Sequence, residues 1–138
     1  MKYCTVEMKQ AYDELSTIGH EFISYILKND WHNAILSMWE FIDTLEFHKD
    51  QMPEEDVKRK IRMATEILHE IATRHWQESK TAFFSIFSDY PENKPYSYDF
   101  DFVTEVIVCG NYLRTQLIKG HVAMVFEFDG EETTLKFW

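Results

Sequence analysis

The histidines are the first candidates for chemistry, because imidazole is the side chain most often used for proton transfer and metal binding near neutral pH. The chain contains six: His20, His32, His48, His69, His75 and His121. Glu66 and His69 have the Glu-x-x-His spacing of di-iron helix bundles, but such a site needs two of these motifs and two further glutamates on facing helices. No second Glu-x-x-His occurs in the sequence. The pattern therefore predicts neither a metal site nor a cofactor.

Other catalytic motifs are also missing from the sequence. It has no His-Glu-x-x-His, no paired Cys-x-x-Cys, no phosphate-binding glycine loop and no Gly-x-Ser-x-Gly. Asp99, Asp101 and Glu105 would share one face of an expected strand, as carboxylates that bind a hard cation do. Acidic side chains on the surface of an antiparallel strand are usually only solvated. We therefore expect no catalytic residue and no enzymatic activity.

The acidic charge of the chain limits the class of partner. The formal net charge is −10, from 24 acidic and 14 basic side chains. Nucleic-acid-binding proteins normally present a clustered basic face, so this charge argues against direct nucleic-acid binding. An acidic surface instead attracts cationic partners over long distances. We expect a cationic protein partner.

The composition is that of one soluble domain. With 138 residues, of which 45% are hydrophobic, the chain can build a sizeable core. Its two cysteines, Cys4 and Cys109, form no disulfide framework and suit a reducing compartment. No apolar run is long enough for a membrane span, and the first residues lack the apolar segment of a signal peptide. We expect a cytoplasmic protein without a membrane partner.

Three N-terminal segments have the apolar spacing of helices. The first runs from Val6 to about Asn29, and the second begins at Asn29 or Asp30, either of which can cap it. Pro53 opens the third, followed by three acids that suit a helix N-terminus. Residues 81–87 either end this helical part or form a fifth, edge strand, and we favour the strand. Residues 88–97, with two prolines, are expected to form a loop.

The C-terminal stretch, residues 99–138, has the turn signals of an antiparallel meander. Gly110-Asn111, Lys119-Gly120 and Asp129-Gly130 are dipeptides that suit two-residue hairpin turns. They predict four strands, and the pairs that follow put one apolar set in the core: Phe100, Phe102, Val106, Val108, Leu113, Leu117, Val122, Met124, Phe126, Leu135 and Phe137. A helix over residues 104–119 is the alternative, but its β-branched residues and Gly110-Asn111 argue against it.

The predicted fold is therefore α+β, with three N-terminal helices packed on one face of a C-terminal four- to five-stranded antiparallel β-meander. Residues 1–138 form a single domain, with a helical part over 1–80 and the sheet over 81–138. The turn register predicts that Leu117 pairs with Val122, Thr115 with Met124, and Met124 with Leu135. It also pairs Leu113 with Phe126 and Val122 with Phe137.

The solvent face of this sheet supplies the candidate binding residues. Glu127 and Glu132 lie opposite each other beside the Asp129-Gly130 turn, and opposed like charges destabilise a free hairpin but suit a cationic partner. An apolar row of Val103, Ile118, His121 and Trp138 crosses the same face. The candidate partner-binding residues are Glu127, Asp129, Glu131, Glu132, Asp101, Glu105, His121 and Trp138.

The overall format resembles the immunity proteins of bacterial toxin–immunity pairs, such as those of contact-dependent growth inhibition. The residues behind the resemblance are the acidic segment Glu127-Phe128-Asp129-Gly130-Glu131-Glu132 and the final Phe137-Trp138. The resemblance implies a cytoplasmic protein that covers the active site or substrate path of one cationic toxin domain, often a nuclease. Two alternatives remain: a homodimeric regulatory or structural adaptor, and a ligand-binding or enzymatic α+β domain with a pocket between sheet and helices.

Overall fold

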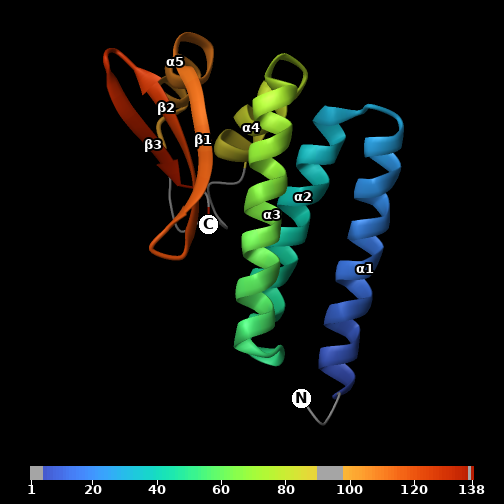
Figure 1. Cartoon of the computed structure of the whole chain (residues 1–138). Coiled ribbons are helices and arrows are strands. Elements are labelled where there is room, and N and C mark those ends of the chain that lie inside the picture. The colour runs from blue at the N-terminus through green and yellow to red at the C-terminus, as the bar shows by residue number, and fades with distance from the viewer. Residues whose placement is uncertain (1–4, 90–97, 137) are drawn as a thin grey trace.

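The computed structural model describes residues 5–89, 98–136 and 138, and these form five α-helices, one short 3-10 helix and a three-stranded antiparallel sheet (Figure 1). The predicted α+β class with a C-terminal antiparallel sheet is confirmed. The predicted three helices and four to five strands are wrong, because two segments expected to be strands are helices. No helix in the described residues is long and apolar enough to cross a membrane.

The three predicted N-terminal helices are present as α1 (Val6–Leu27), α2 (Trp31–His48) and α3 (Glu54–Arg74). Asp30 caps α2, since its carboxylate accepts a hydrogen bond from the Asn33 N–H at 3.2 Å. The 3-10 helix η1 (Lys49–Gln51) connects α2 to α3. α3 packs against both α2 and β1, and α1 packs along α2 (Figure 1).

Residues 76–89 form a fourth helix, α4 (Trp76–Asp89), so the expected edge strand over 81–87 is wrong. The buried positions explain the helix, because they recur at spacings of three and four residues: Ser79, Ala82, Phe83, Ile86 and Phe87. Phe83 is fully buried, and α4 packs against α2 and the next helix. The expected loop over 88–97 lies almost entirely outside the described residues.

The expected first strand of the meander is instead the helix α5 (Phe100–Cys109). The Asp99 carboxylate caps it by accepting hydrogen bonds from the N–H groups of Asp101, at 2.7 Å, and Phe102, at 3.4 Å. Val103, Val106 and Ile107 form its buried stripe. Burial of this stripe outweighs the β propensity of the branched residues. Gly110-Asn111 is therefore not a hairpin turn but the junction between α5 and the first strand.

The sheet has the order β1-β2-β3, formed by β1 (Asn111–Ile118), β2 (His121–Phe128) and β3 (Glu131–Lys136). The two remaining turns are two-residue turns as predicted. Lys119 and Gly120 have φ values of 52° and 83°, and Asp129 and Gly130 have φ values of 56° and 82°. Positive φ at both central positions is the conformation whose twist suits a hairpin.

The predicted register is confirmed over most of this sheet. Leu117 pairs with Val122, Thr115 with Met124, and Met124 with Leu135. The predicted pair of Leu113 with Phe126 is wrong, because an irregularity between Tyr112 and Arg114 makes Tyr112 the partner of Phe126. The predicted pair of Val122 with Phe137 lies outside the described residues.

The predicted core set is correct in the described residues of β2 and β3 and only partly correct in β1 and α5. Val122, Met124, Phe126 and Leu135 are buried, and Leu117 is half-buried. Val106 is buried too, but from a helix. Four members of the predicted core lie on the surface, because the helical period of α5 and the irregularity in β1 turn their side chains outward: Phe100, Phe102, Val108 and Leu113.

The contact between α3 and β1 joins the helical layer to the sheet. His69 Nδ1 lies 3.3 Å from the Thr115 N–H and 2.9 Å from the Tyr112 hydroxyl. Because the backbone group can only donate, Nδ1 accepts from both. The Tyr112 ring also stacks on Trp76, with 5.3 Å between centroids. Burial in this contact raises the pKa of the Tyr112 hydroxyl to about 12.

A second ring contacts the opposite edge of the sheet. The Lys136 N–H on β3 donates a hydrogen bond to the Tyr98 hydroxyl at 2.7 Å. Tyr98 precedes α5 and packs edge-on against Phe87 of α4, with 6.3 Å between centroids. β3 is thereby connected to the two helices that flank the sheet.

We predict that the Tyr112 contact weakens at alkaline pH. The folded pKa of Tyr112 lies above its ordinary value of 10.0, so the unfolded chain ionises first. This contribution to stability is complete below pH 10 and is lost as the pH rises from about 10 to about 12. The free energy of unfolding from urea denaturation at several pH values should fall less steeply over this interval in Tyr112→Phe than in the native chain. Tyr25→Phe, on α1, is the matched control and should follow the native chain. The prediction would be contradicted if the free energy of unfolding fell equally steeply with pH in the native chain and in Tyr112→Phe.

Candidate partner-binding surface

The outward side of α5 combines acidic and apolar residues. Asp101, Glu105 and Val108 follow one another at spacings of four and three residues, so they share the face opposite the buried stripe. All three are exposed, and the Val108 side chain is 68% exposed. Asp101 and Glu105 therefore do share a face, as predicted, but through the period of a helix rather than that of a strand.

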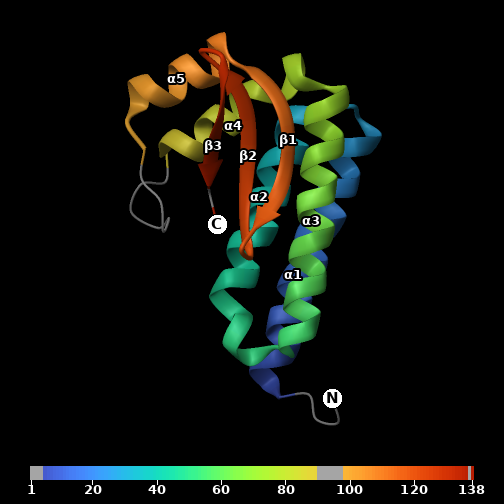
Figure 2. The ribbon, with the colours of Figure 1, turned by 60° about the vertical axis from the view of Figure 1, so that its left-hand side comes forward.

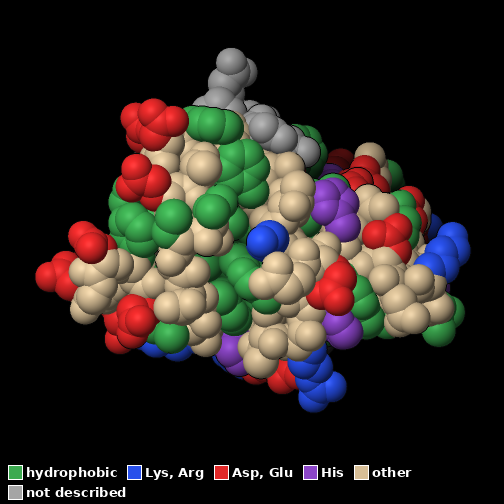
Figure 3. All heavy atoms as spheres, turned by 90° about the horizontal axis from the view of Figure 1, so that it is seen from above, with side chains coloured by type: hydrophobic (Ala, Val, Ile, Leu, Met, Phe, Trp, Pro, Cys, Tyr) green, Lys and Arg blue, Asp and Glu red, His purple; other side chains and the backbone are tan. Residues whose placement is uncertain are grey.

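Large apolar side chains flank this face of α5. Phe100 is 59% exposed and meets Phe84 of α4 edge-on, with 5.2 Å between ring centroids. Phe102 stacks near Tyr98, and Leu113 follows at the start of β1. Figure 3 views the molecule from this end and shows hydrophobic side chains gathered among acidic ones over α5 and the sheet. Exposed apolar groups gathered in one region typically mark an interaction site.

The β2–β3 turn places further acids beside the C-terminal end of α5. Gly110 ends α5 against β2, and a Cβ at this position would lie 3.2 Å from the Glu127 carbonyl and 2.4 Å from that of Val106. Only glycine permits this close approach. The turn and α5 lie together at one end of the sheet in both ribbon views (Figures 1 and 2).

The acids of the turn differ in their partners. Glu127 and Glu132 face each other as predicted, but Arg114 on β1 donates a hydrogen bond to Glu132 at 2.6 Å and so relieves the repulsion. Glu127, Asp129 and Glu131 are exposed and have no ion-pair partner within residues 5–89, 98–136 and 138. These three acids are the ones available to a cationic partner.

We call this surface the α5 patch and define it by nine residues: Phe100, Asp101, Phe102, Glu105, Val108, Leu113, Glu127, Asp129 and Glu131. It contains five of the eight predicted binding residues, with Glu132 paired at its edge. Sequence reasoning missed the four apolar members because it assigned them to the core. The signal that identifies the three on α5 is the spacing of Val103, Val106 and Ile107 after the capping Asp99.

Two predicted binding residues lie at the other end of the sheet. His121 and Phe128 are the first and last residues of β2, which spans roughly 23 Å at the usual rise per residue. His121 Nδ1 lies 3.0 Å from the Trp138 carbonyl oxygen. The predicted apolar row is wrong at Val103, which belongs to α5. Ile118, His121 and Trp138 remain neighbours, but away from the α5 patch.

The described residues contain no arrangement typical of an active site. No three His, Cys, Asp or Glu side chains among them converge as metal ligands. The His48 ring is buried between helices, and its Nε2 lies 2.6 Å from Glu14, which lowers the pKa of that carboxyl. This pair joins α1 to α2.

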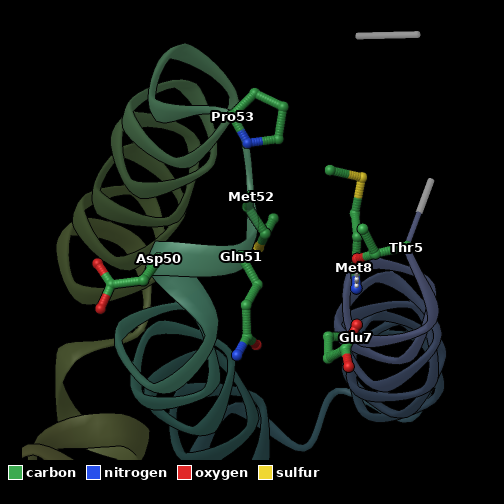
Figure 4. A pocket seen from close by; sticks show the side chains of 7 residues that line it. All are labelled: Thr5, Glu7, Met8, Asp50, Gln51, Met52 and Pro53. Atoms are coloured by element: carbon green, nitrogen blue, oxygen red, sulfur yellow. Dashed lines mark hydrogen bonds between the residues drawn. The ribbon is translucent and has the colours of Figure 1, made fainter. Parts of the chain in front are cut away.

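A hollow of about 760 Å³ lies between the first turn of α1 and the segment after η1 (Figure 4). Figure 4 shows Met8 opposite Met52 and Pro53, with the Asp50 carboxylate directed away from α1. Its titratable lining groups among the described residues are the carboxylates of Glu7 and Asp50. The Thr5 hydroxyl, which also lines the hollow, accepts a hydrogen bond from the Met8 N–H at 3.0 Å and caps α1.

Comparison with known proteins identifies no relative. No family model, no curated protein and no solved structure gives a significant match to the chain.

The position of the α5 patch should depend on the Asp99 cap. We expect Asp99→Ala to lower the free energy of unfolding by about 1 kcal/mol, because two backbone N–H groups lose their acceptor. Asp99→Ser keeps a side-chain oxygen and should retain most of that stability. Urea denaturation of the three proteins measures the difference. An alanine variant as stable as the native chain would show that the cap does not hold α5.

Proposed function

We propose that the protein is a small binding protein that neutralises a cationic protein domain, as immunity proteins neutralise their cognate toxins. The α5 patch is the surface that meets this domain. The proposal includes a cytoplasmic location and no catalytic role for the protein itself. It agrees with the resemblance of the acidic β2–β3 segment to such proteins.

The observation that carries the proposal is the combination of exposed apolar side chains with unpaired acids. Phe100 and Val108 are each more than half exposed, and Glu127, Asp129 and Glu131 lie beside the C-terminal end of α5. Protein interfaces commonly have an apolar centre that supplies most of the affinity and a polar rim that supplies specificity. The α5 patch has both parts on one end of the molecule.

Charge explains how such a protein could block a nuclease-like domain. A surface built to hold phosphate groups is cationic, and carboxylates can occupy the same positions. With a net charge of −10, the protein also accelerates the encounter with a basic partner. The complex would then keep the partner's substrate away by covering its binding surface.

A second copy of the chain suits the α5 patch less well. A twofold contact applies the same surface to itself, so the acids of one copy would face those of the other. Like charges in contact cost free energy, and the acids of the patch have no ion-pair partner within the described residues to offset that cost, since Arg114 is already bound to Glu132. A cationic partner avoids this cost.

The test is a charge-reversal experiment with the cognate toxin domain, which the proposal expects at the C-terminus of the protein encoded immediately upstream. Glu127→Lys, Asp129→Lys and Glu131→Lys in one variant should abolish both the complex and protection from the toxic activity. Lysine is tolerated at the turn position of Asp129, because Lys119 occupies the equivalent position of the other turn with a similar positive φ. Surface plasmon resonance measures binding, and association with the native chain should slow as salt concentration rises.

The matched control reverses three exposed acids of α1 in one variant: Glu7→Lys, Asp13→Lys and Glu21→Lys. Both variants change the net charge by +6, from −10 to −4. The control should bind with a modestly reduced association rate and an unchanged dissociation rate. Failure of the native chain to bind or protect would overturn the proposed function. Equal losses in the two variants would reject the α5 patch as its surface.

A further inference from the structure

A groove of about 520 Å³ lies at the end of the sheet opposite the α5 patch. Val57 and Ile61 of α3 line one side, and Leu117 and Gly120 of the β1–β2 hairpin line the other. Trp138 closes it. Figures 1 and 2 both place the β1–β2 turn beside the N-terminal half of α3.

The groove exists because α3 and β1 are in contact along only part of their length. His69, in the C-terminal half of α3, meets Tyr112 and Thr115 near the start of β1. Toward Leu117 the strand makes no hydrogen bond to α3 among the described residues, and the Leu117 side chain is only half-buried. Apolar atoms of both layers therefore face a space large enough for a small molecule, since ligand pockets span about 300–1,000 Å³.

The rim of the groove carries both charges: the bases Lys49, Lys58 and Arg62 line it together with the acids Asp50 and Glu54. Lys58 pairs with Glu54 at 3.1 Å, and Lys49 pairs with Glu46 at 2.8 Å. Arg62, one turn after Lys58, also lines the groove but has no ion-pair partner in the described part of the chain. A guanidinium that borders an apolar floor is well suited to a carboxylate, which it can bind through two parallel hydrogen bonds.

A second observation points to a missing acceptor. The indole Nε1–H of Trp138 is buried and has no hydrogen-bond partner among the described residues. A buried donor without an acceptor is unfavourable, so buried indole N–H groups normally have one. The side chain that carries this donor is one of those that line the groove.

We propose that the groove binds a small amphipathic carboxylate, with the apolar body on Val57, Ile61 and Leu117 and the carboxylate at Arg62. The inference does not depend on the proposed function, because the α5 patch lies at the other end of the sheet. It assigns to Trp138 a role in closing a ligand site.

The test uses sodium decanoate and the full chain in isothermal titration calorimetry, below the micelle concentration of the ligand. The native chain should bind one decanoate with saturable heat. Arg62→Gln should weaken binding about tenfold, the effect of losing one charge-assisted contact. Arg59→Gln is the matched control: it removes the same charge from the same exposed helix surface, but Arg59 pairs with Asp56 and does not line the groove. This variant should bind like the native chain.

Decanol supplies a second readout that net charge alone cannot explain. It shares the apolar body without the carboxylate, so Arg62→Gln should not change its affinity. Absence of saturable decanoate binding by the native chain would overturn the proposal. Equal weakening of decanoate binding by Arg59→Gln and Arg62→Gln would also overturn it, because the ligand would then respond only to total charge.

Discussion

The contact between α3 and β1 determines how the rest of the molecule is arranged. A single histidine nitrogen accepts from a strand amide and from the Tyr112 hydroxyl, and the tyrosine ring lies on Trp76 at the start of α4. One small cluster thus fixes the third helix, the fourth helix and the first strand relative to one another. The two ends of the sheet differ on either side of this cluster. α5 and the β2–β3 turn lie at one end, and the groove between α3 and the β1–β2 hairpin lies at the other.

Sequence reasoning succeeded where the local chemistry of the backbone decides the structure. Lys119-Gly120 and Asp129-Gly130 adopt positive φ values that few other residues tolerate, so the turns and the register between them could be predicted. It failed at residues 81–87 and 100–109, where phenylalanine and β-branched residues favour a strand locally. There the helix is decided by burial against α2, α4 and the sheet, which a short sequence window does not contain. The irregularity near Leu113 has no signal in the sequence that we recognise.

The candidate surface was predictable in its charges and not in its apolar residues. Asp101, Glu105 and the acids of the β2–β3 turn could be identified from their types alone, because acidic side chains are exposed in either secondary structure. Phe100, Phe102 and Val108 change from core to surface when a strand becomes a helix, since the period of the side chains changes from two to 3.6 residues. Because residues 100–109 were expected to form a strand, these apolar side chains were assigned to the core. They are the part of the patch that would supply most of the affinity in the proposed complex.

Both outer strands of the sheet have an amide occupied by a ring from the helical part. On β1 the Thr115 N–H donates to His69, and on β3 the Lys136 N–H donates to Tyr98. Amides that point away from β2 are the ones that an incoming strand would need. Sheet extension by a peptide or by another copy would have to displace a packed aromatic ring at either edge. These two contacts therefore hinder the edge-to-edge pairing that begins β-aggregation at the positions of Thr115 and Lys136.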